Sequence, residues 1–407
     1  MARSAYREAA ASIEQAMAAP SHLAESRDTI EQAIDLRLEL RSALFTLAPP
    51  GAIIEHLREA ERLAEVLGDQ SRMGRVAAFL CISYGQGNDL EQGVEAGERA
   101  LVLAAALEDV PLLAVVRTHL AGVHIRQGHY APAKELLGAN VELLDGERAR
   151  ERFGMVGYPS VVSRSLLVWC LSEQGDFAEG IAHGRAGLEL AEELGQPYSL
   201  GVTTLRLGSL YLRRGDHAEA IRLLERSLDI CQRGDVVTLA GGVAQVLAYA
   251  YALAGRSAHA LLLINRATRW GDPRSIANAG GVGVSKAYLL CGQIDDAAHL
   301  ARVTLDHARS LKSHVHVGWA LQILGEVAAL RSDADEAEHR YRASLALAEQ
   351  LEMRPLQAHC HVGLGKLFRR LGRPDQARAE LATAVAMLRE MGMTFWLPEA
   401  ERELAEM

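Results

Sequence analysis

The chain has 407 residues, of which 49% are hydrophobic, 23% charged and only 5% aromatic, with a formal net charge of −9. This composition excludes a disordered chain, and the acidic balance argues against a nucleic-acid partner, because phosphate binding needs a basic face. The five cysteines are scattered without a CxxC motif, no signal peptide begins the chain, and no apolar stretch could span a membrane, so we predict a cytoplasmic protein without a membrane partner.

The first fifty residues predict helices that do not complete a repeat. Residues 2–19 have the pattern of one amphipathic helix, and a helix over 25–47 is expected to pair with one over 52–67 across the degenerate turn at 48–51. A helical array that starts with half a unit exposes an apolar edge. We therefore expect that something precedes residue 1, or that the N-terminal face is a contact site, for instance for self-association.

From residue 51 to residue 390 a short phrase recurs, in which a turn residue is followed five positions later by a small residue. The interval between successive phrases is close to 40 residues, which predicts a tandem array. Glycine suits the cramped or left-handed backbone of such a turn. The phrases begin at Asn88, Gly128, Gly175, Gly215, Gly255, Gly292, Ser332 and Gly372.

The segments between these turns have helical periodicity. In 218–231, for example, apolar residues recur at the i, i+3, i+4 spacing of one buried stripe. Each unit is therefore predicted to be a helix A, a tight turn and a helix B. Small residues seven positions before most turns, such as Gly208 and Gly365, and the small residues five positions after the turns, such as Ala220 and Ala377, would let the two helices approach closely.

Two of these phrases resemble the tetratricopeptide repeat (TPR): Gly208-x-x-Tyr211-x-x-x-Gly215 continuing to Ala220, and the matching stretch from Gly365 to Ala377. The runs 25–37, 55–61, 152–155, 353–361, 363–367 and 393–401 resemble the C-terminal repeat region of bacterial signalling proteins that carry an adenylate/guanylate cyclase, an AAA-type ATPase and TPRs. The resemblance implies an all-α, right-handed TPR-like α-solenoid. We predict one such solenoid over residues 1–407, with about nine long helix pairs.

Three segments depart from the regular pattern. The step from Gly128 to Gly175 is 47 residues long, so residues 146–159 are expected to form an inserted loop or short helix. Residues 270–283 are rich in glycine and should distort their helix pair. Residues 391–407 are expected to cap the array, with the segment 395–397 folding over the last pair before a short helix over 398–406.

Motifs for catalysis, cofactors or metals fail on inspection. The stretch Gly363-Leu-Gly365-Lys366 lacks the earlier glycine and the hydroxyl residue of a phosphate loop, and Gly281-Val-Gly283 follows no strand. His314 with His316, and His359 with Cys360 and His361, are possible zinc ligands, but residues two apart on a helix point about 200° apart. No GxSxG, HExxH or CxxC motif is present. We predict no catalytic residue, cofactor or metal.

The remaining candidate site is the concave groove of the solenoid, which helices A should line. Trp169 and Tyr249 would serve there as aromatic anchors, and Lys366, Arg369 and Arg370 form a basic end that suits a carboxylate. The same positions are also consistent with a solvated helix face that binds nothing. The predicted inner positions are Arg75, Thr118, Ser165, Trp169, Gln245, Tyr249, Lys286, Gln322, Glu326, Lys366, Arg369 and Arg370.

The function that follows is a non-catalytic interaction module that binds a peptide or protein in this groove. The family resemblance implies that it is the regulatory or sensor arm of a cyclase/ATPase-type signalling protein, with the upstream cyclase/ATPase domain as a partner. The alternatives are a stand-alone scaffold, a small-ligand sensor, or an enzyme with a site near 146–159 or in the histidine-rich C-terminal repeats.

Overall fold

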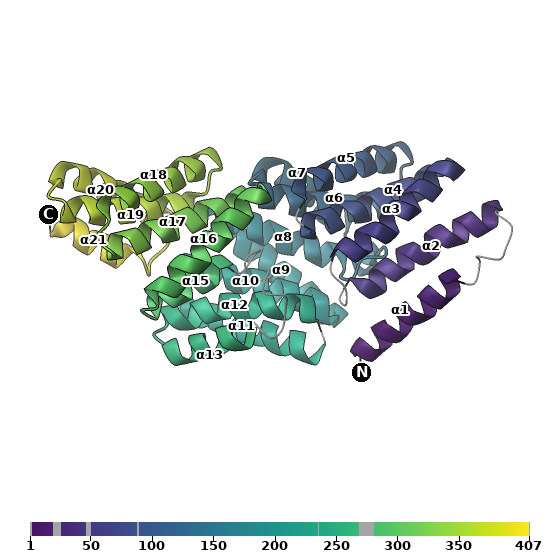
Figure 1. Cartoon of the computed structure of the whole chain (residues 1–407), viewed down its shortest axis with the longest axis horizontal. Coiled ribbons are helices and arrows are strands. Elements are labelled where there is room, and N and C mark those ends of the chain that lie inside the picture. Colours follow the sequence, from purple (N-terminus) through teal and green to yellow (C-terminus); the bar gives the residue numbers. More distant parts are fainter. Residues whose placement is uncertain are drawn as a thin grey trace.

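The structure, a computed structural model, describes residues 2–18, 26–45, 50–87, 89–234, 236–267 and 281–406. These residues form twenty α-helices and one 3-10 helix, and they contain no strand. The helices lie side by side along the molecule from α1 at one end to α21 at the other (Figure 1). The predicted all-α, TPR-like solenoid is confirmed, and none of the described helices is long and apolar enough to cross a membrane.

The helices form nine A/B pairs between a lone helix at each end of the chain. The lone helices are α1 (Ala2–Ala18) and α21 (Leu397–Ala405). The pairs are α2 (Arg27–Leu44) with α3 (Pro50–Leu67), α4 (Gln70–Gln86) with α5 (Leu90–Ala106), α6 (Val110–Gln127) with α7 (Tyr130–Leu143), α8 (Pro159–Gln174) with α9 (Phe177–Leu194), α10 (Pro197–Arg214) with α11 (His217–Arg233), α12 (Val237–Leu253) with α13 (Ser257–Ala267), α15 (Gly281–Leu290) with α16 (Ile294–Ser310), α17 (His314–Leu330) with α18 (Ala334–Gln350), and α19 (Arg354–Arg370) with α20 (Pro374–Glu390).

The repeat phrase acts in the structure as the sequence predicts. The six turn glycines from Gly128 to Gly372 all have positive φ, and Ser332 adopts the same left-handed backbone. Asn88 and the first two residues of the turn predicted at 48–51 lie outside the described residues, whereas Pro50 and Gly51 begin helix α3. A Cβ built on Gly365 would stand 2.5 Å from Leu381 Cγ, so α19 and α20 approach too closely for a larger residue there.

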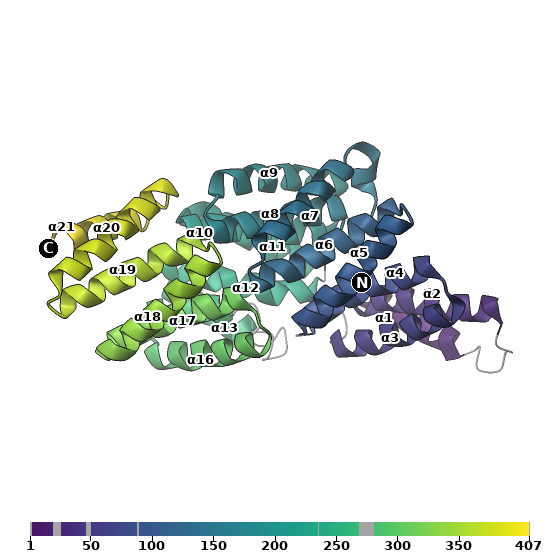
Figure 2. The same cartoon turned by 90° about the horizontal axis from the view of Figure 1, so that it is seen from above.

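The array curves until its C-terminal repeats touch its middle ones, which the sequence analysis did not predict. Helix α17 contacts α6, and α19 contacts α8 (Figure 2). Three apolar side chains from the C-terminal part pack against three successive turn glycines in the middle of the array. We call this contact the seam, and its pairs are Leu351 on Gly128, Met391 on Gly175 and Phe395 on Gly215.

The two ends are finished differently. Helix α1 packs on α2 through a small cluster of Ala10, Leu40 and Ala43. At the other end, Trp396 packs against a cluster that includes Val385 and Leu388 of the last helix pair. Phe395 also reaches across the seam, where its ring lies 4.0 Å from the ring of His217, measured between centroids. The C-terminal segment therefore ties the last repeat to the middle of the array.

The 146–159 segment forms the short 3-10 helix η2 (Gly146–Arg150) followed by an irregular stretch. This stretch lies against three other parts of the solenoid. Arg41 Nη1 donates to the carbonyl of Gly154, Gln196 Nε2 donates to the carbonyl of Val156 at 3.0 Å, and Met155 joins the N-terminal hydrophobic core. Residues 268–280, most of the segment predicted to be distorted, lie outside the described residues, and α15 begins at Gly281.

A candidate binding pocket on the concave face

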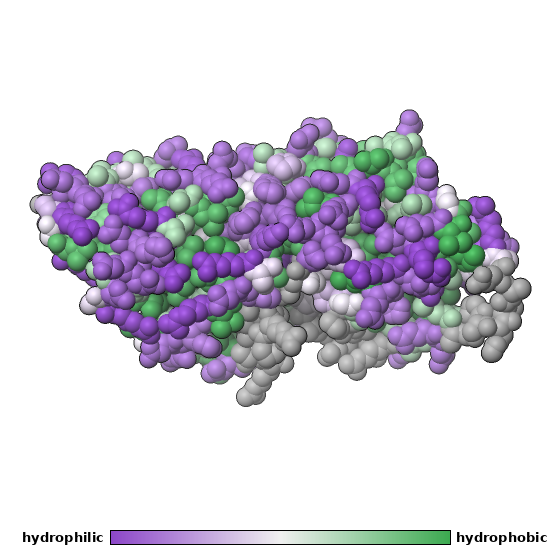
Figure 3. Space-filling view, turned by 45° about the horizontal axis from the view of Figure 1, so that its top comes forward, coloured by the Kyte–Doolittle hydropathy of each residue, from purple (hydrophilic) through white to green (hydrophobic). Residues whose placement is uncertain are grey.

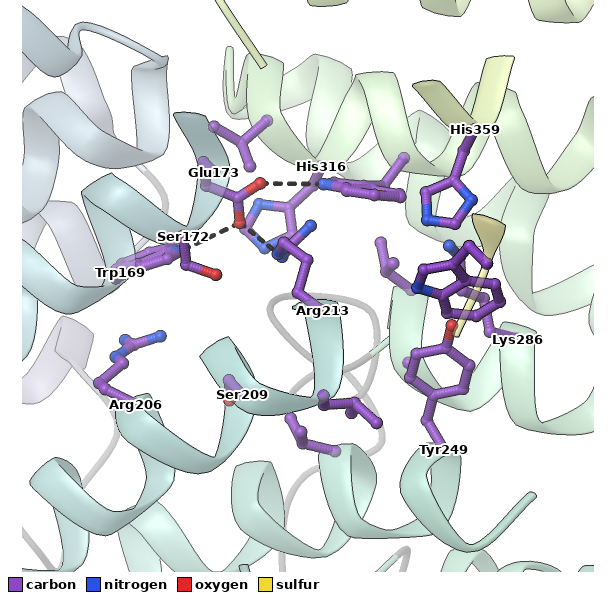
Figure 4. Close-up of a pocket in the computed structure, with 17 residues that line it drawn as sticks. Trp169, Ser172, Glu173, Arg206, Ser209, Arg213, Tyr249, Lys286, His316 and His359 are labelled. Atoms are coloured by element: carbon purple, nitrogen blue, oxygen red, sulfur yellow. Dashed lines mark hydrogen bonds and ion pairs between the residues drawn. The ribbon is translucent and has the colours of Figure 1, made fainter. Parts of the chain in front are cut away.

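A cavity of about 180 Å³ lies where six successive A helices, α8, α10, α12, α15, α17 and α19, face one another (Figure 4). The expectation that A helices line the inner surface is therefore met at this place. On the outer face seen in Figure 3, hydrophobic side chains occur in separate groups between hydrophilic ones. The cavity is lined by Trp169, Ser172, Glu173, Arg206, Ser209, Leu212, Arg213, Val246, Tyr249, Val282, Gly283, Lys286, Val315, His316, Trp319, His359 and Trp396.

Aromatic side chains make up much of the cavity wall. Trp169, Trp319, Trp396 and Tyr249 all face it. The His359 ring stands edge-on to Trp319 and to Trp396, with centroid distances of 5.9 Å and 4.8 Å. The Nε1 of Trp396 is buried without a hydrogen-bond partner among the described residues. Such a wall suits a ligand with an apolar or aromatic part, and Trp396 adds a free donor.

One buried carboxylate organises one side of the cavity. Glu173 is 2% exposed. Its Oε1 accepts from Arg213 Nη2 at 2.7 Å and from Trp169 Nε1 at 3.3 Å, and its Oε2 accepts from Trp319 Nε1 at 3.1 Å (Figure 4). These bonds fix two indole rings and one guanidinium, and they join α8 to α17. Both oxygens of Glu173 are thus engaged by the protein itself.

Two cations of the wall have no carboxylate partner. Arg206 Cζ lies 4.0 Å from the Trp169 ring centroid, and Lys286 Nζ lies 4.2 Å from the Trp319 centroid and 5.7 Å from that of Tyr249. Neither side chain forms a hydrogen bond or ion pair with any residue that the structure describes. Burial lowers the pKa of Arg206 to about 10 and that of Lys286 to about 8.

The histidines of the cavity are neutral at pH 7. Burial lowers the pKa of His316 to about 3, and the nearby Arg126 and Arg206 guanidinium groups act in the same direction. The Nδ1 of His316 shares a hydrogen bond of 2.7 Å with Ser313 Oγ. Burial, reinforced by Lys286, also lowers the pKa of His359 well below its ordinary value. The fixed charges of the wall are therefore three cations and one carboxylate.

Among the twelve predicted groove residues, Trp169, Tyr249 and Lys286 line this cavity. Arg75 lines a second cavity of about 210 Å³, bounded by α4, α6 and the inserted segment near Phe153. Glu326 lies next to Gln322, whose Nε2 donates to it at 2.6 Å.

The structure corrects the placement of four predicted residues, because they are buried and line neither cavity. Thr118 Oγ1 lies 3.1 Å from Ser163 Oγ, and Ser165 Oγ lies 2.9 Å from Thr203 Oγ1, so these hydroxyls link neighbouring A helices. Gln245 and Gln322 are buried as well. The hydroxyls of Thr118 and Ser165 therefore bond within the packed layer of A helices and do not face a ligand groove.

The basic end also differs from the expectation. Lys366 pairs with Glu399, and Arg369 pairs with Glu403 at 2.9 Å and with Glu406 at 2.7 Å. All three carboxylates belong to the C-terminal segment, chiefly α21. Arg370 Nη1 lies 3.4 Å from the carbonyl of Ala329. The carboxylates that this end was expected to take from a ligand are supplied by the chain itself.

Sequence reasoning missed most of the cavity wall because it followed a few fixed positions of the repeat. Trp169, Tyr249 and Lys286 all stand six residues before their turn glycine, as does Ser209, which was not predicted. Other missed residues come from other positions: Glu173 and Arg213 from the last turns of their helices, and Trp319 and His359 from the second turns of theirs. The cavity crosses the repeats obliquely, so its wall includes residues near both ends of the A helices. The signal that could have identified them is the occurrence of charged and aromatic residues near both ends of these helices.

No metal site replaces this cavity as a candidate. In the part of the chain that the structure describes, no three His, Cys, Asp or Glu side chains are grouped to hold an ion. Among the predicted ligands, His361 Nδ1 lies 2.6 Å from Glu380 Oε2, and the thiol of Cys360 donates to Ser344 Oγ.

Comparison with known proteins supports the fold. The tetratricopeptide repeat family model matches residues 165–233 and 317–390. A Rap protein in complex with competence and sporulation factor has 14% identity over 95% of this chain and 94% of that one, with a TM-score of 0.53. The apo form of the quorum sensor NprR from B. thuringiensis has 11% identity over 89% and 100%, with a TM-score of 0.51. Apo RapI has 14% identity over 69% and 98%, with a TM-score of 0.50. None of the curated proteins matches the sequence. Two stretches of the chain therefore match the tetratricopeptide repeat model, and the resemblance of the chain to these structures is one of fold.

Proposed function

We propose that this chain is a non-catalytic sensor module that binds a short peptide or protein segment in the cavity on its concave face. The observation that carries this proposal is the cavity itself, which has four aromatic side chains in its wall and two cations without a carboxylate partner, the buried Lys286 and the half-buried Arg206. Buried charges left without a partner are costly for a folded protein. A ligand that supplies the missing counter-charge offsets part of this unfavourable free energy, and the offset contributes to its affinity.

The structural neighbours support a peptide over other ligands. One of them was solved with competence and sporulation factor bound, and another is described as a quorum sensor. These descriptions concern those proteins, and the shared fold makes peptide sensing the first function to test here.

The resemblance to cyclase–ATPase–TPR proteins extends the proposal to a regulatory role in the cytoplasm. Occupancy of the cavity would shift the state of an upstream cyclase/ATPase domain, provided that the ligand binds one state more tightly than the other. The coding sequence upstream of residue 1 tests this part. An unrelated reading frame there would discard the cyclase/ATPase connection while leaving the binding module intact.

A peptide-display selection tests the binding function. The intact chain is compared with Tyr249→Ala, which removes a cavity wall, and with Tyr251→Ala on the same helix. Tyr251 is a matched control, because its hydroxyl bonds Glu225 at 2.7 Å and it does not line the cavity. We expect the intact chain and Tyr251→Ala to enrich the same peptides, and Tyr249→Ala to bind them about tenfold more weakly. An absence of enriched peptides, or equal binding by all three, would reject the proposal.

A further inference from the structure

Among the residues that line the cavity, Lys286 gives the most information about the charge of a ligand. Its side chain is 8% exposed, faces the cavity and has no hydrogen-bond or ion-pair partner among the described residues. The charged and titratable groups that act on it are Glu326, Arg213, Cys360, Glu173 and His359. An ammonium group buried in this way is costly unless an anion or a hydrogen-bond acceptor pairs with it.

The protein's own carboxylates do not fill this need. Both oxygens of Glu173 are held by Arg213 and two indoles. Glu326 attracts Lys286, but it is bonded to Gln322 and does not line the cavity. Among the charged side chains that line the cavity, three are cations and one is a carboxylate, so positive charge is in excess. This surplus matches an anionic ligand.

The remaining walls define what the negative charge is attached to. The indole rings of Trp169 and Trp319 already contact Arg206 and Lys286. The Nε1 of Trp396 has no hydrogen-bond acceptor among the described residues. A cavity of about 180 Å³ can hold a group about the size of one large side chain. Inorganic phosphate or sulfate would meet the cations but leave the aromatic walls without an apolar partner.

We infer that the cavity recognises a carboxylate joined to an aromatic or large aliphatic group, as at the carboxyl-terminal residue of a peptide or in a small free organic acid. In this arrangement the carboxylate pairs with Lys286, the charge of Arg206 on the opposite side of the cavity adds to the attraction, and the apolar group lies against the aromatic wall (Figure 4). The inference rests on the proposed function and specifies the chemistry of its ligand.

Titration calorimetry with matched probes tests the inference on the intact chain. The probes are N-acetyl-leucyl-phenylalanine, its carboxamide, and 3-phenylpropanoate. We expect the free acid to bind at least about tenfold more tightly than the carboxamide, because only the acid carries the charge. If 3-phenylpropanoate binds as well as the dipeptide, the source is a small acid, and if only the dipeptide binds, the source is a peptide end. Both outcomes support the inference.

Variants tie the preference to Lys286. Lys286→Met should weaken binding of the acid about tenfold and leave the carboxamide unchanged, whereas Lys312→Met, at an exposed lysine paired with Glu91, should change neither. Arg206→Gln is a second variant in case Lys286→Met does not fold. Equal binding of acid and carboxamide, or no binding of either acid, would overturn the inference. Peptides recovered by display in that case would keep the proposed function, and an empty display selection would reject it as well.

Discussion

Two buried cations, one in each half of the molecule, show how the same repeat produces either a core or a cavity. Arg41 in α2 is 1% exposed, and its guanidinium lies 4.0 Å from the Phe79 ring centroid and 5.1 Å from that of Phe45. Lys286 in α15 is similarly buried against Trp319. Neither pairs with a carboxylate among the described residues. Arg41 is enclosed by the protein's own chain, whereas Lys286 faces open space.

The difference lies in what each concave surface receives from the rest of the chain. In the N-terminal half, the inserted segment brings Phe153, Gly154 and Met155 against α2 and α4, and the Gly154 carbonyl accepts from Arg41. Among the described residues of the second half, none forms such an insertion. The concave surface is instead closed from the far side by the C-terminal repeats at the seam. The insertion covers the surface beside Arg41 and leaves a cavity of about 210 Å³ next to it, whereas the seam closes the cavity that Lys286 lines.

Breaking the seam is the change with the largest expected effect. In Gly175→Ala the new methyl group would meet Met391 Sδ at 2.5 Å, at a residue whose φ is +87°. We expect a loss of about 2–4 kcal/mol in the free energy of unfolding, from backbone strain and overpacking together. Urea denaturation measures the loss. Gly195→Ala is the control, because its φ is +63° with nothing within 4 Å, and it should lose only about 1 kcal/mol. Equal losses would show that the seam contributes no packing.

The seam also marks the limit of what the sequence predicts about the fold. The units were predictable because each is set by residues close in the sequence, such as Ala377, five residues after Gly372 and fully buried. The seam joins Leu351 to Gly128 and Met391 to Gly175, which lie more than two hundred positions apart. Such contacts depend on small rotations between neighbouring units that accumulate along the array, and one unit's sequence does not reveal them.

The same reason explains the partial prediction of the site. Three wall residues share one repeat position and were predicted, because that position faces the cavity in their three units. Glu173 and Trp319 meet only because the array has turned far enough to bring α17 against α8. Their pairing follows from the superhelix and not from the repeat.

Lowering the pH tests whether water is excluded to the same degree from the buried histidines of both halves. Burial lowers the pKa of His119, beneath Phe79, and of His316, at the cavity, to about 3 each. The folded protein therefore binds fewer protons than the unfolded chain, so stability is full above pH 6.5 and falls as the pH drops towards 3. At pH 5 each histidine should cost about 2 kcal/mol relative to pH 7.5.

Urea midpoints at the two pH values measure this cost. His119→Gln and His316→Gln should each remove one share of the pH dependence, whereas His299→Gln, at an exposed position, should remove none. If His316→Gln leaves the pH dependence unchanged while His119→Gln reduces it, water reaches the cavity wall more freely than its burial indicates.

Replacing the two buried cations by methionine tests the comparison directly. Burial lowers the pKa of Lys286 from 10.5 to about 8, which corresponds to a cost of about 3 kcal/mol for the charged form. Lys286→Met removes that cost and loses the contacts with two aromatic rings, so we expect a net gain of about 1–2 kcal/mol in stability. Arg41→Met would leave a gap between two rings and an unpaired Gly154 carbonyl, so we expect no gain. Thermal denaturation measures both changes. Equal gains in stability for the two variants would mean that the protein compensates the charge of Arg41 no better than that of Lys286.

The smallest effect is expected at the basic end, where the C-terminal helix already occupies the cations. Lys366 pairs with Glu399 near the surface, and such pairs contribute at most about 1 kcal/mol. Lys366→Gln should therefore change stability by less than about 1 kcal/mol, and it should leave the affinity for display-selected peptides within about twofold, as calorimetry would measure. Arg206→Gln, which removes an unpaired cation from the cavity wall, should weaken the same peptides by about tenfold. If Lys366→Gln weakens them as much as Arg206→Gln does, ligands reach the basic end by displacing α21, and the cavity is then only one part of a longer groove.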